Sequence, residues 1–148
     1  MEKNRTRLKA IGFTVVELCV AIAIVALLAK IAYPSFMQYI INGRRADATT
    51  ALLDLANRME QYYAANNTFA TATIAAGVTA TDVLTSNASQ QGYYTLSIVS
   101  SGTTTNTYTI KASRAGAQAS DALCGDYQLT SAGVKTNPSA SLPSSRCW

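Results

Sequence analysis

An apolar run near the N-terminus constrains the fold of this chain more than any other feature. Residues 13–29 contain only Thr14, Glu17 and the weakly polar Cys19 among otherwise apolar side chains. Extended to residue 33, the run predicts a helix of about 30 Å, which is long enough to cross a bilayer. Four basic residues precede it: Lys3, Arg5, Arg7 and Lys9. They predict a cytoplasmic N-terminus, with the rest of the chain on the other side of the membrane.

The apolar run fits two kinds of membrane segment. A secretory signal would be removed at a small-x-small site at the end of its apolar core. Ala21-Ile22-Ala23 has that form, but further apolar residues follow it to Ala29, and Glu17 within the core also fits a signal poorly. We therefore expect the segment to be retained in the mature protein.

The residue content argues against enzymatic and metal-dependent functions. The chain has no histidine, which excludes Ser-His-Asp and Cys-His catalysis and histidine-ligated metals. Asp121 and Asp126 flank Cys124, but two carboxylates do not supply the oxygen ligands of a Ca²⁺ site. We interpret them as solvated loop charges, and we expect no enzyme activity, no cofactor and no bound metal.

Positive charge is concentrated ahead of the apolar run. The formal net charge is +4, yet residues 42–148 hold 7 basic and 6 acidic side chains. Four cations in the second half could line a DNA-tracking patch: Lys111, Arg114, Lys135 and Arg146. Because they are few and offset by acidic residues, they are more simply explained as solubilising surface residues. DNA is therefore a weakly supported partner, and we expect only weak DNA affinity.

Pro34 and the residues after it predict a second helical stretch. Proline lacks an N–H and clashes with the preceding turn, so we expect a helix break at Pro34 with a bend near residues 30–34. Residues 35–65 then carry apolar side chains at helical spacing. These are Ala48, Leu52, Leu55, Ala56, Met59, Tyr62 and Tyr63. Polar residues are expected on the other side: Asp47, Asp54, Arg58 and Gln61. The apolar stripe therefore needs a partner.

Alternation of apolar and polar residues indicates strands beyond residue 92. Residues 93–98 and 107–112 alternate around a turn at Gly102, and a third strand begins at Tyr127 and ends before Gly133. This pattern predicts an antiparallel sheet of three or four strands with one apolar face. Residues 67–91 are expected to form a long loop, with at most a short helix. The predicted fold class is α+β, with a long hydrophobic helix, kinked near Pro34, packed against the small sheet.

The three cysteines fall into two groups. Cys19 lies within the apolar run and is expected to be a small apolar filler. Cys124 and Cys147 lie in the part that is expected outside the cytoplasm, where thiols oxidise. A disulfide between them would close a loop of about 24 residues, which is worth about 3.5 kcal/mol in the chain-entropy model.

The start of the apolar run resembles type IV pilins. Lys9-Ala10-Ile11-Gly12-Phe13-Thr14-Val15-Val16-Glu17-Leu18 has the family's basic leader, its Gly-Phe pair and its glutamate five residues after the glycine, and Pro34 matches the family's proline. Residues 45–63 and 124–135, with Cys147-Trp148, look like the helix and the C-terminal region of the PilE class. The sequence departs from many pilins at Ala26, where they carry a glycine.

The resemblance implies a domain organisation and three processing or assembly residues. It implies a leader peptide, 1–12, a transmembrane and filament-core helix, 13–33, and a globular head, 34–148, which includes the amphipathic helix 35–65. A prepilin peptidase would cut between Gly12 and Phe13 and methylate the new amine of Phe13. Glu17 would pair with this amine in a neighbouring subunit, because no lysine or arginine lies between residues 13 and 29.

The resulting expectation is a structural subunit of a type IV pilus, a fimbrium that serves cell adhesion and twitching motility. The implied partners are other pilin subunits, the prepilin peptidase/methyltransferase, the inner membrane and its pilus assembly machinery. The precursor would lie in the inner membrane and the mature subunit in the extracellular pilus. Two alternatives are a minor pilin with a DNA-uptake or adhesion role and a type II secretion pseudopilin. The C-terminal cysteine loop favours a pilus pilin over the pseudopilin.

Overall fold

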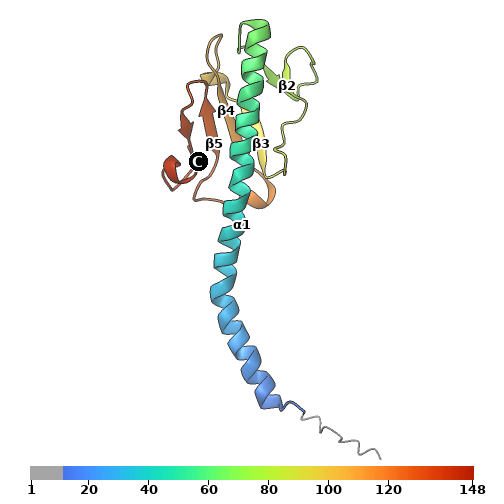
Figure 1. Cartoon of the computed structure of the whole chain (residues 1–148), viewed down its shortest axis with the longest axis vertical. Coiled ribbons are helices and arrows are strands. Elements are labelled where there is room, and N and C mark those ends of the chain that lie inside the picture. The colour runs from blue at the N-terminus through green and yellow to red at the C-terminus, as the bar shows by residue number, and fades with distance from the viewer. Residues whose placement is uncertain (1–11) are drawn as a thin grey trace, which may run out of the picture. The chain divides into compact units, whose positions relative to one another are not determined.

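The computed structural model describes residues 12–148, which Figure 1 shows from blue near the N-terminus to red at Trp148. Contacts between Cα atoms divide the chain into two compact units, the first ending at Gln38 and the second comprising Tyr39–Trp148. Helix α1 (Val15–Asn66) contributes to both units. Within residues 12–148, every strand belongs to the second unit.

In the first unit, the described residues form the N-terminal part of α1. Thr14 caps this end of the helix, because the backbone N–H of Glu17 donates a hydrogen bond to Thr14 Oγ1 at 3.2 Å. The bond satisfies one of the N–H groups that a helix leaves unpaired at its start. An 18-residue window of α1 has a mean hydropathy of 2.5 and no buried residues, so by length and composition this helix could cross a membrane.

Pro34 does not break the helix. It lies inside α1, which continues on both sides of it, so the expected helix break at this residue is wrong. Proline fixes φ near −65°, which is a helical value, and it removes a single main-chain N–H. The loss of one hydrogen bond does not end a helix that has many other turns to hold it.

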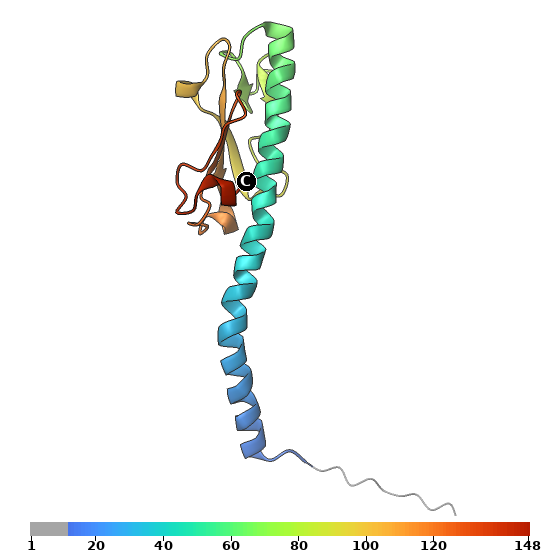
Figure 2. The same cartoon turned by 60° about the vertical axis from the view of Figure 1, so that its left-hand side comes forward.

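The second unit combines the C-terminal part of α1 with a four-stranded antiparallel sheet. The strand order is β3 (Tyr94–Ile98), β4 (Thr109–Arg114), β5 (Tyr127–Thr130) and β6 (Lys135–Thr136). Leu96 pairs with Ala112, which pairs with Tyr127, so apolar residues share one face of the sheet. Figures 1 and 2 show the C-terminal part of α1 lying along the sheet. The predicted α+β fold, with three or four antiparallel strands, is confirmed.

The core lies between α1 and the sheet. Ala48, Leu52, Leu55 and Met59 of the predicted helical stripe are fully buried. They belong to one cluster with Tyr94, Ile110 and Tyr127 of the sheet. Each fully buried leucine or methionine contributes about 1.5–3 kcal/mol of hydrophobic free energy. The prediction that the stripe packs on the sheet is therefore confirmed.

Asp47 is an exception to the expected polar side of α1. It is 5% exposed, so the prediction that it faces solvent is wrong. Its carboxylate accepts hydrogen bonds from Ser89 Oγ at 2.5 Å and from the backbone N–H groups of Gln91 at 3.2 Å and Tyr93 at 3.4 Å. The carboxylate thereby fastens the chain just before β3 to the helix.

The connection between α1 and β3 contains two short parallel strands, β1 (Thr73–Ile74) and β2 (Asp82–Leu84). No helix occurs in residues 67–91, all of which are described. Asp82 accepts hydrogen bonds from Thr73 Oγ1 at 2.6 Å and from the backbone N–H groups of Ala76 at 3.0 Å and Val78 at 2.9 Å. These bonds lower the pKa of Asp82. Three single-turn helices lie in later connections: η1 (Ser100–Gly102), η2 (Gly116–Gln118) and η3 (Ser144–Arg146).

Candidate functional site

Gly12 and Phe13 lie just before Thr14, the residue that caps α1, and both are exposed. The Phe13 side chain is 80% exposed. A Cβ atom added at Gly12 would meet no atom within 4 Å. The fold of the described residues therefore does not require glycine at position 12. The rest of the expected leader, residues 1–11, lies outside the described residues.

Glu17 lies in the first turn of α1 and is exposed. Thr14-Val15-Val16-Glu17 has the spacing of a capping box, in which the first residue caps the helix and the fourth is acidic. The capping bond from the Glu17 N–H to Thr14 Oγ1 confirms half of this motif. The sequence carries this signal, but our expectation for Glu17 missed it. Within residues 12–148, Glu17 forms no ion pair, so its carboxylate can still pair with another chain.

The apolar surface of α1 in the first unit extends round the whole helix. All residues from Gly12 to Phe36 are exposed. Large apolar side chains occur throughout: Val15, Val16, Leu18, Val20, Ile22, Ile24, Val25, Leu27, Leu28 and Ile31. Soluble proteins rarely leave so large an apolar surface in water, so lipid chains or other apolar helices must cover it. Cys19 is a free, exposed cysteine within this surface.

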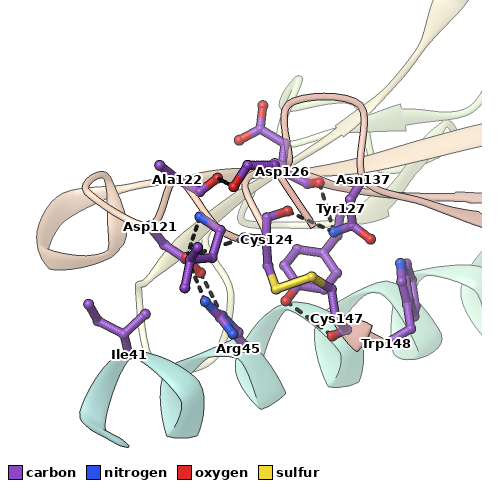
Figure 3. Close-up of a disulfide and its surroundings, with 12 residues drawn as sticks. Ile41, Arg45, Asp121, Ala122, Cys124, Asp126, Tyr127, Asn137, Cys147 and Trp148 are labelled. Atoms are coloured by element: carbon purple, nitrogen blue, oxygen red, sulfur yellow. Dashed lines mark hydrogen bonds and ion pairs between the residues drawn. A yellow bond between two sulfur atoms is a disulfide. The ribbon is translucent and has the colours of Figure 1, made fainter. Parts of the chain in front are cut away.

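In the second unit, Cys124 and Cys147 form a disulfide, as predicted, and Figure 3 shows its surroundings. The Tyr127 hydroxyl donates a hydrogen bond to the carbonyl of Cys147 at 3.2 Å. The Tyr127 ring makes edge-to-face contacts with Tyr94 and Trp148. The C-terminal tail is therefore held covalently to Cys124, and to Tyr127 of β5 by a hydrogen bond and aromatic packing.

Cys147→Ser is expected to lower the free energy of unfolding by about 2–5 kcal/mol, because the opened chain regains conformational entropy when it unfolds. Urea unfolding of the full chain in detergent micelles measures this change in the free energy of unfolding. Wild type with reductant should approach the midpoint of the variant, whereas reductant should leave the variant unchanged. If wild type, reduced wild type and variant share one midpoint, the disulfide does not stabilise the head.

A buried ion pair joins α1 to the loop before Cys124. Arg45 Nε and Nη2 each lie 2.7 Å from a carboxylate oxygen of Asp121, and the two side chains are 12% and 1% exposed; Figure 3 shows them facing each other. Burial by itself would raise the pKa of Asp121. The bonds and charge of Arg45, with the N–H groups of Cys124 and Leu123, outweigh it and lower that pKa. The expectation that Asp121 is a solvated loop charge is wrong.

Asp126, the second expected loop charge, is also paired. It lies 2.9 Å from Lys111 Nζ and 3.1 Å from Arg114 Nε. Burial would raise the pKa of Asp126, but the hydrogen bonds from Lys111 and Arg114 outweigh it, so the pKa is lowered. Lys111 and Arg114 are therefore not free solubilising cations. Within residues 12–148, no three His, Cys, Asp or Glu side chains form a metal-binding group.

Lys135 and Arg146 differ from these two cations. Both are exposed, and neither takes part in the ion pairs of the described residues. Lys135 Nζ lies 5.1 Å from the centroid of the Trp148 ring, which is a cation–π contact. The four cations that the sequence offered thus form two sets. Lys111 and Arg114 of β4 are partly neutralised by Asp126, whereas Lys135 of β6 and Arg146 of the C-terminal tail form no ion pair within the described residues.

Two solved structures resemble this fold. A type IV pilin from Shewanella oneidensis is 22% identical, with 73% of this chain and 97% of that chain covered and a TM-score of 0.46. The non-core minor pilin PilV from Neisseria meningitidis is 19% identical, with 72% of this chain and 94% of that chain covered and a TM-score of 0.51. At this level of identity, the likeness to PilV shows a shared fold.

Sequence comparisons identify the family. The fimbrial protein EcpC of Eikenella corrodens is 31% identical over 70 residues, which are 47% of this chain and 46% of that protein. The match thus spans less than half of that relative. A family profile described as "Type IV minor pilin ComP, DNA uptake sequence receptor" matches residues 34–128, which is well over half of the chain. The chain therefore belongs to the type IV minor pilin ComP family.

Proposed function

We propose that this chain is a structural subunit of a type IV pilus and that it polymerises through residues 13–33. The observation that carries the proposal is the apolar, fully exposed surface of α1 in the first unit. Membership of a minor pilin family and the pilin fold of the head support it. In a filament, the helices of successive subunits would cover one another and remove this surface from water.

Maturation would begin at the inner membrane. A prepilin peptidase would remove residues 1–12, and the membrane assembly machinery would then extract the subunit into the extracellular pilus. Two observations support the cut between Gly12 and Phe13. Both residues are exposed ahead of α1, and the fold places no demand for glycine at position 12.

Glu17 would set the register between subunits. Cleavage gives Phe13 a free amine, and the exposed Glu17 carboxylate has no ion-pair partner within residues 12–148. An unpaired carboxylate at membrane depth costs roughly 2.5–3.5 kcal/mol on insertion scales. Pairing with the amine of an adjacent subunit offsets much of that cost. Single buried polar groups select one register between apolar helices in the same way.

The subunit recovered from sheared pili is expected to begin at Phe13 and to carry an N-methyl group. Gly12→Val should fold normally, because a Cβ at Gly12 meets no atom within 4 Å. It should nevertheless remain uncut, since the peptidase must grip an extended, unobstructed backbone. Intact mass spectrometry of envelope and pilus fractions checks both outcomes. Filaments whose subunits start at Met1, or after Ala23, would contradict the proposed maturation.

DNA binding is a second candidate function. The matching family is described as a DNA uptake sequence receptor, and this description favours DNA over other extracellular ligands. Lys135 and Arg146 support the candidate, because both are exposed and keep their charge. Cations of this kind attract the phosphate backbone and release its counterions.

A further inference from the structure

A depression of about 350 Å³ lies between α1 and the C-terminal tail. One wall is a single face of the helix, at positions 42, 45, 46 and 49, which are spaced i, i+3, i+4 and i+7. The other wall is formed by Arg146, Cys147 and Trp148. Figure 3 shows Arg45, Cys147 and Trp148 lying above this stretch of α1. The tail wall lies beyond residue 128, where the family match ends.

The charge around the depression is positive. Arg45 is neutralised by Asp121. Arg146 on the tail wall and Lys135 above the Trp148 ring have no acidic partner within the described residues. Elsewhere in the second unit, Lys111 and Arg114 share Asp126, and Arg58 pairs with Asp54. Arg44 forms no ion pair either, but its guanidinium lies 4.7 Å from the centroid of the Tyr93 ring and donates a hydrogen bond to the Ala117 carbonyl. The two cations beside the tail are therefore free to meet an external anion.

The tail wall is held in place before any ligand arrives. Cys147 is bonded to Cys124, and its carbonyl accepts the Tyr127 hydroxyl. Trp148 Nε1 donates a hydrogen bond to the carbonyl of Thr136 at 3.4 Å, and the Trp148 ring packs against Tyr127. A binding group on a fixed segment loses less conformational entropy when it engages its ligand. Arg146 is thus displayed from a rigid base, although its own side chain is exposed.

We propose that this depression is a contact site for the DNA backbone, in which Arg146 of its lining engages one phosphate group and Lys135, which lies over the Trp148 ring outside the lining, engages a second. The proposal rests on the DNA-receptor role given above as the second candidate function. It locates that role at the junction of the tail with α1 and at Lys135 of β6, and not at Lys111 and Arg114 of β4. A cation that contacts a phosphate contributes to affinity and to salt dependence, but not to sequence selection.

The test compares Arg146→Gln with Arg58→Gln in the full chain in zwitterionic detergent micelles. Both variants remove one arginine charge, but Arg58 belongs to an exposed i,i+4 pair on α1 and not to the depression. Fluorescence anisotropy with a labelled DNA duplex gives the affinity across a salt series. Loss of one phosphate contact should weaken binding about five-fold at 0.15 M salt and reduce the slope of log K against log salt by about 0.9. Arg58→Gln should leave both quantities near wild type.

Trp148 supplies a local readout, because it is the only tryptophan in the chain. DNA that occupies the depression should change Trp148 emission along the same binding curve as the anisotropy. Arg146→Gln should shift both curves together. Phosphatidylglycerol added to the micelles in the absence of DNA separates a lipid phosphate from a DNA phosphate as the ligand.

The outcomes separate this inference from the function on which it rests. If the chain binds DNA with no change in Trp148 emission and Arg146→Gln binds as tightly as wild type, the DNA-receptor role stands but this site is wrong. A wild-type chain that does not bind the duplex would overturn both. A Trp148 response to phosphatidylglycerol without any response to DNA would overturn DNA as the ligand. The expected result is a response to DNA that weakens in Arg146→Gln and persists in Arg58→Gln.

Discussion

Replacement of Arg45 by methionine is expected to lower the free energy of unfolding by about 3–5 kcal/mol, because it strands a buried carboxylate. Asp121 is only 2% exposed, and both of its oxygens are bonded to Arg45. Methionine has a similar length but cannot supply charge or hydrogen bonds. Urea unfolding of the full chain in micelles, followed by Trp148 fluorescence, measures the change.

Two controls separate the lost charge pair from lost packing. Arg45→Met combined with Asp121→Asn removes both charges and keeps an acceptor for the Leu123 and Cys124 N–H groups, so it should be more stable than Arg45→Met alone. Arg58→Met breaks an exposed pair and should cost at most about 0.5 kcal/mol. A double variant as unstable as the single one would show that packing, and not the charge, is responsible.

The effect of Arg45→Met should also depend on pH. The pKa of Asp121 is lowered in the folded state, so its pairing contributes stability above the unfolded pKa of about 3.9, and this contribution is lost as pH falls through the lower folded value. The difference in the free energy of unfolding between wild type and Arg45→Met should therefore be largest near neutral pH and should shrink below about pH 4.

Glu17→Val is expected to insert into the membrane and fold normally, yet to be absent from filaments when it is the only copy of the subunit. Removal of the carboxylate removes the partner of the incoming Phe13 amine, while apolar packing between the helices remains. The substitution keeps the backbone N–H that donates to Thr14 Oγ1, so the cap of α1 is preserved. Quantitative blotting of membrane and sheared-filament fractions measures the loss.

Thr14→Ala is the matched control for Glu17→Val. It removes the capping oxygen, which costs roughly 0.5–2 kcal/mol of helix stability, and it keeps the carboxylate. We expect Thr14→Ala subunits to enter filaments. If both variants are excluded equally, Glu17 acts by starting the helix, and the register mechanism must be abandoned. If Glu17→Val enters filaments in normal amounts, the carboxylate is incidental to assembly.

The sequence correctly predicted the elements in which apolar residues recur at a short, regular spacing. The α1 stripe from Ala48 to Met59 repeats every three or four residues, and the alternation in β3 and β4 repeats every two. In both cases, one face must be buried whatever the rest of the chain does. The Cys124–Cys147 disulfide could also be predicted, because no other cysteine lies in the second unit.

The features that the sequence did not predict depend on partners far along the chain. Asp47 finds its donors 42 to 46 residues later, and Arg45 finds Asp121 after 76 residues. A local pattern places such charged residues on a solvated face, and only the tertiary fold shows that they are buried and satisfied. The Thr14 cap is different, since its motif is local and could have been recognised.

The accessibility of Cys19 in intact pili tests the central claim, burial of the apolar helix between subunits, most directly. Cys19 is exposed in the isolated chain, and the other two cysteines are bonded to each other, so a maleimide reports on this position alone. We expect sheared filaments containing this subunit to resist the reagent, and the same subunits to take up one label each after dissociation in detergent. Labelling of intact filaments as fast as of dissociated subunits would show that the helix is not covered, and would contradict the proposed assembly.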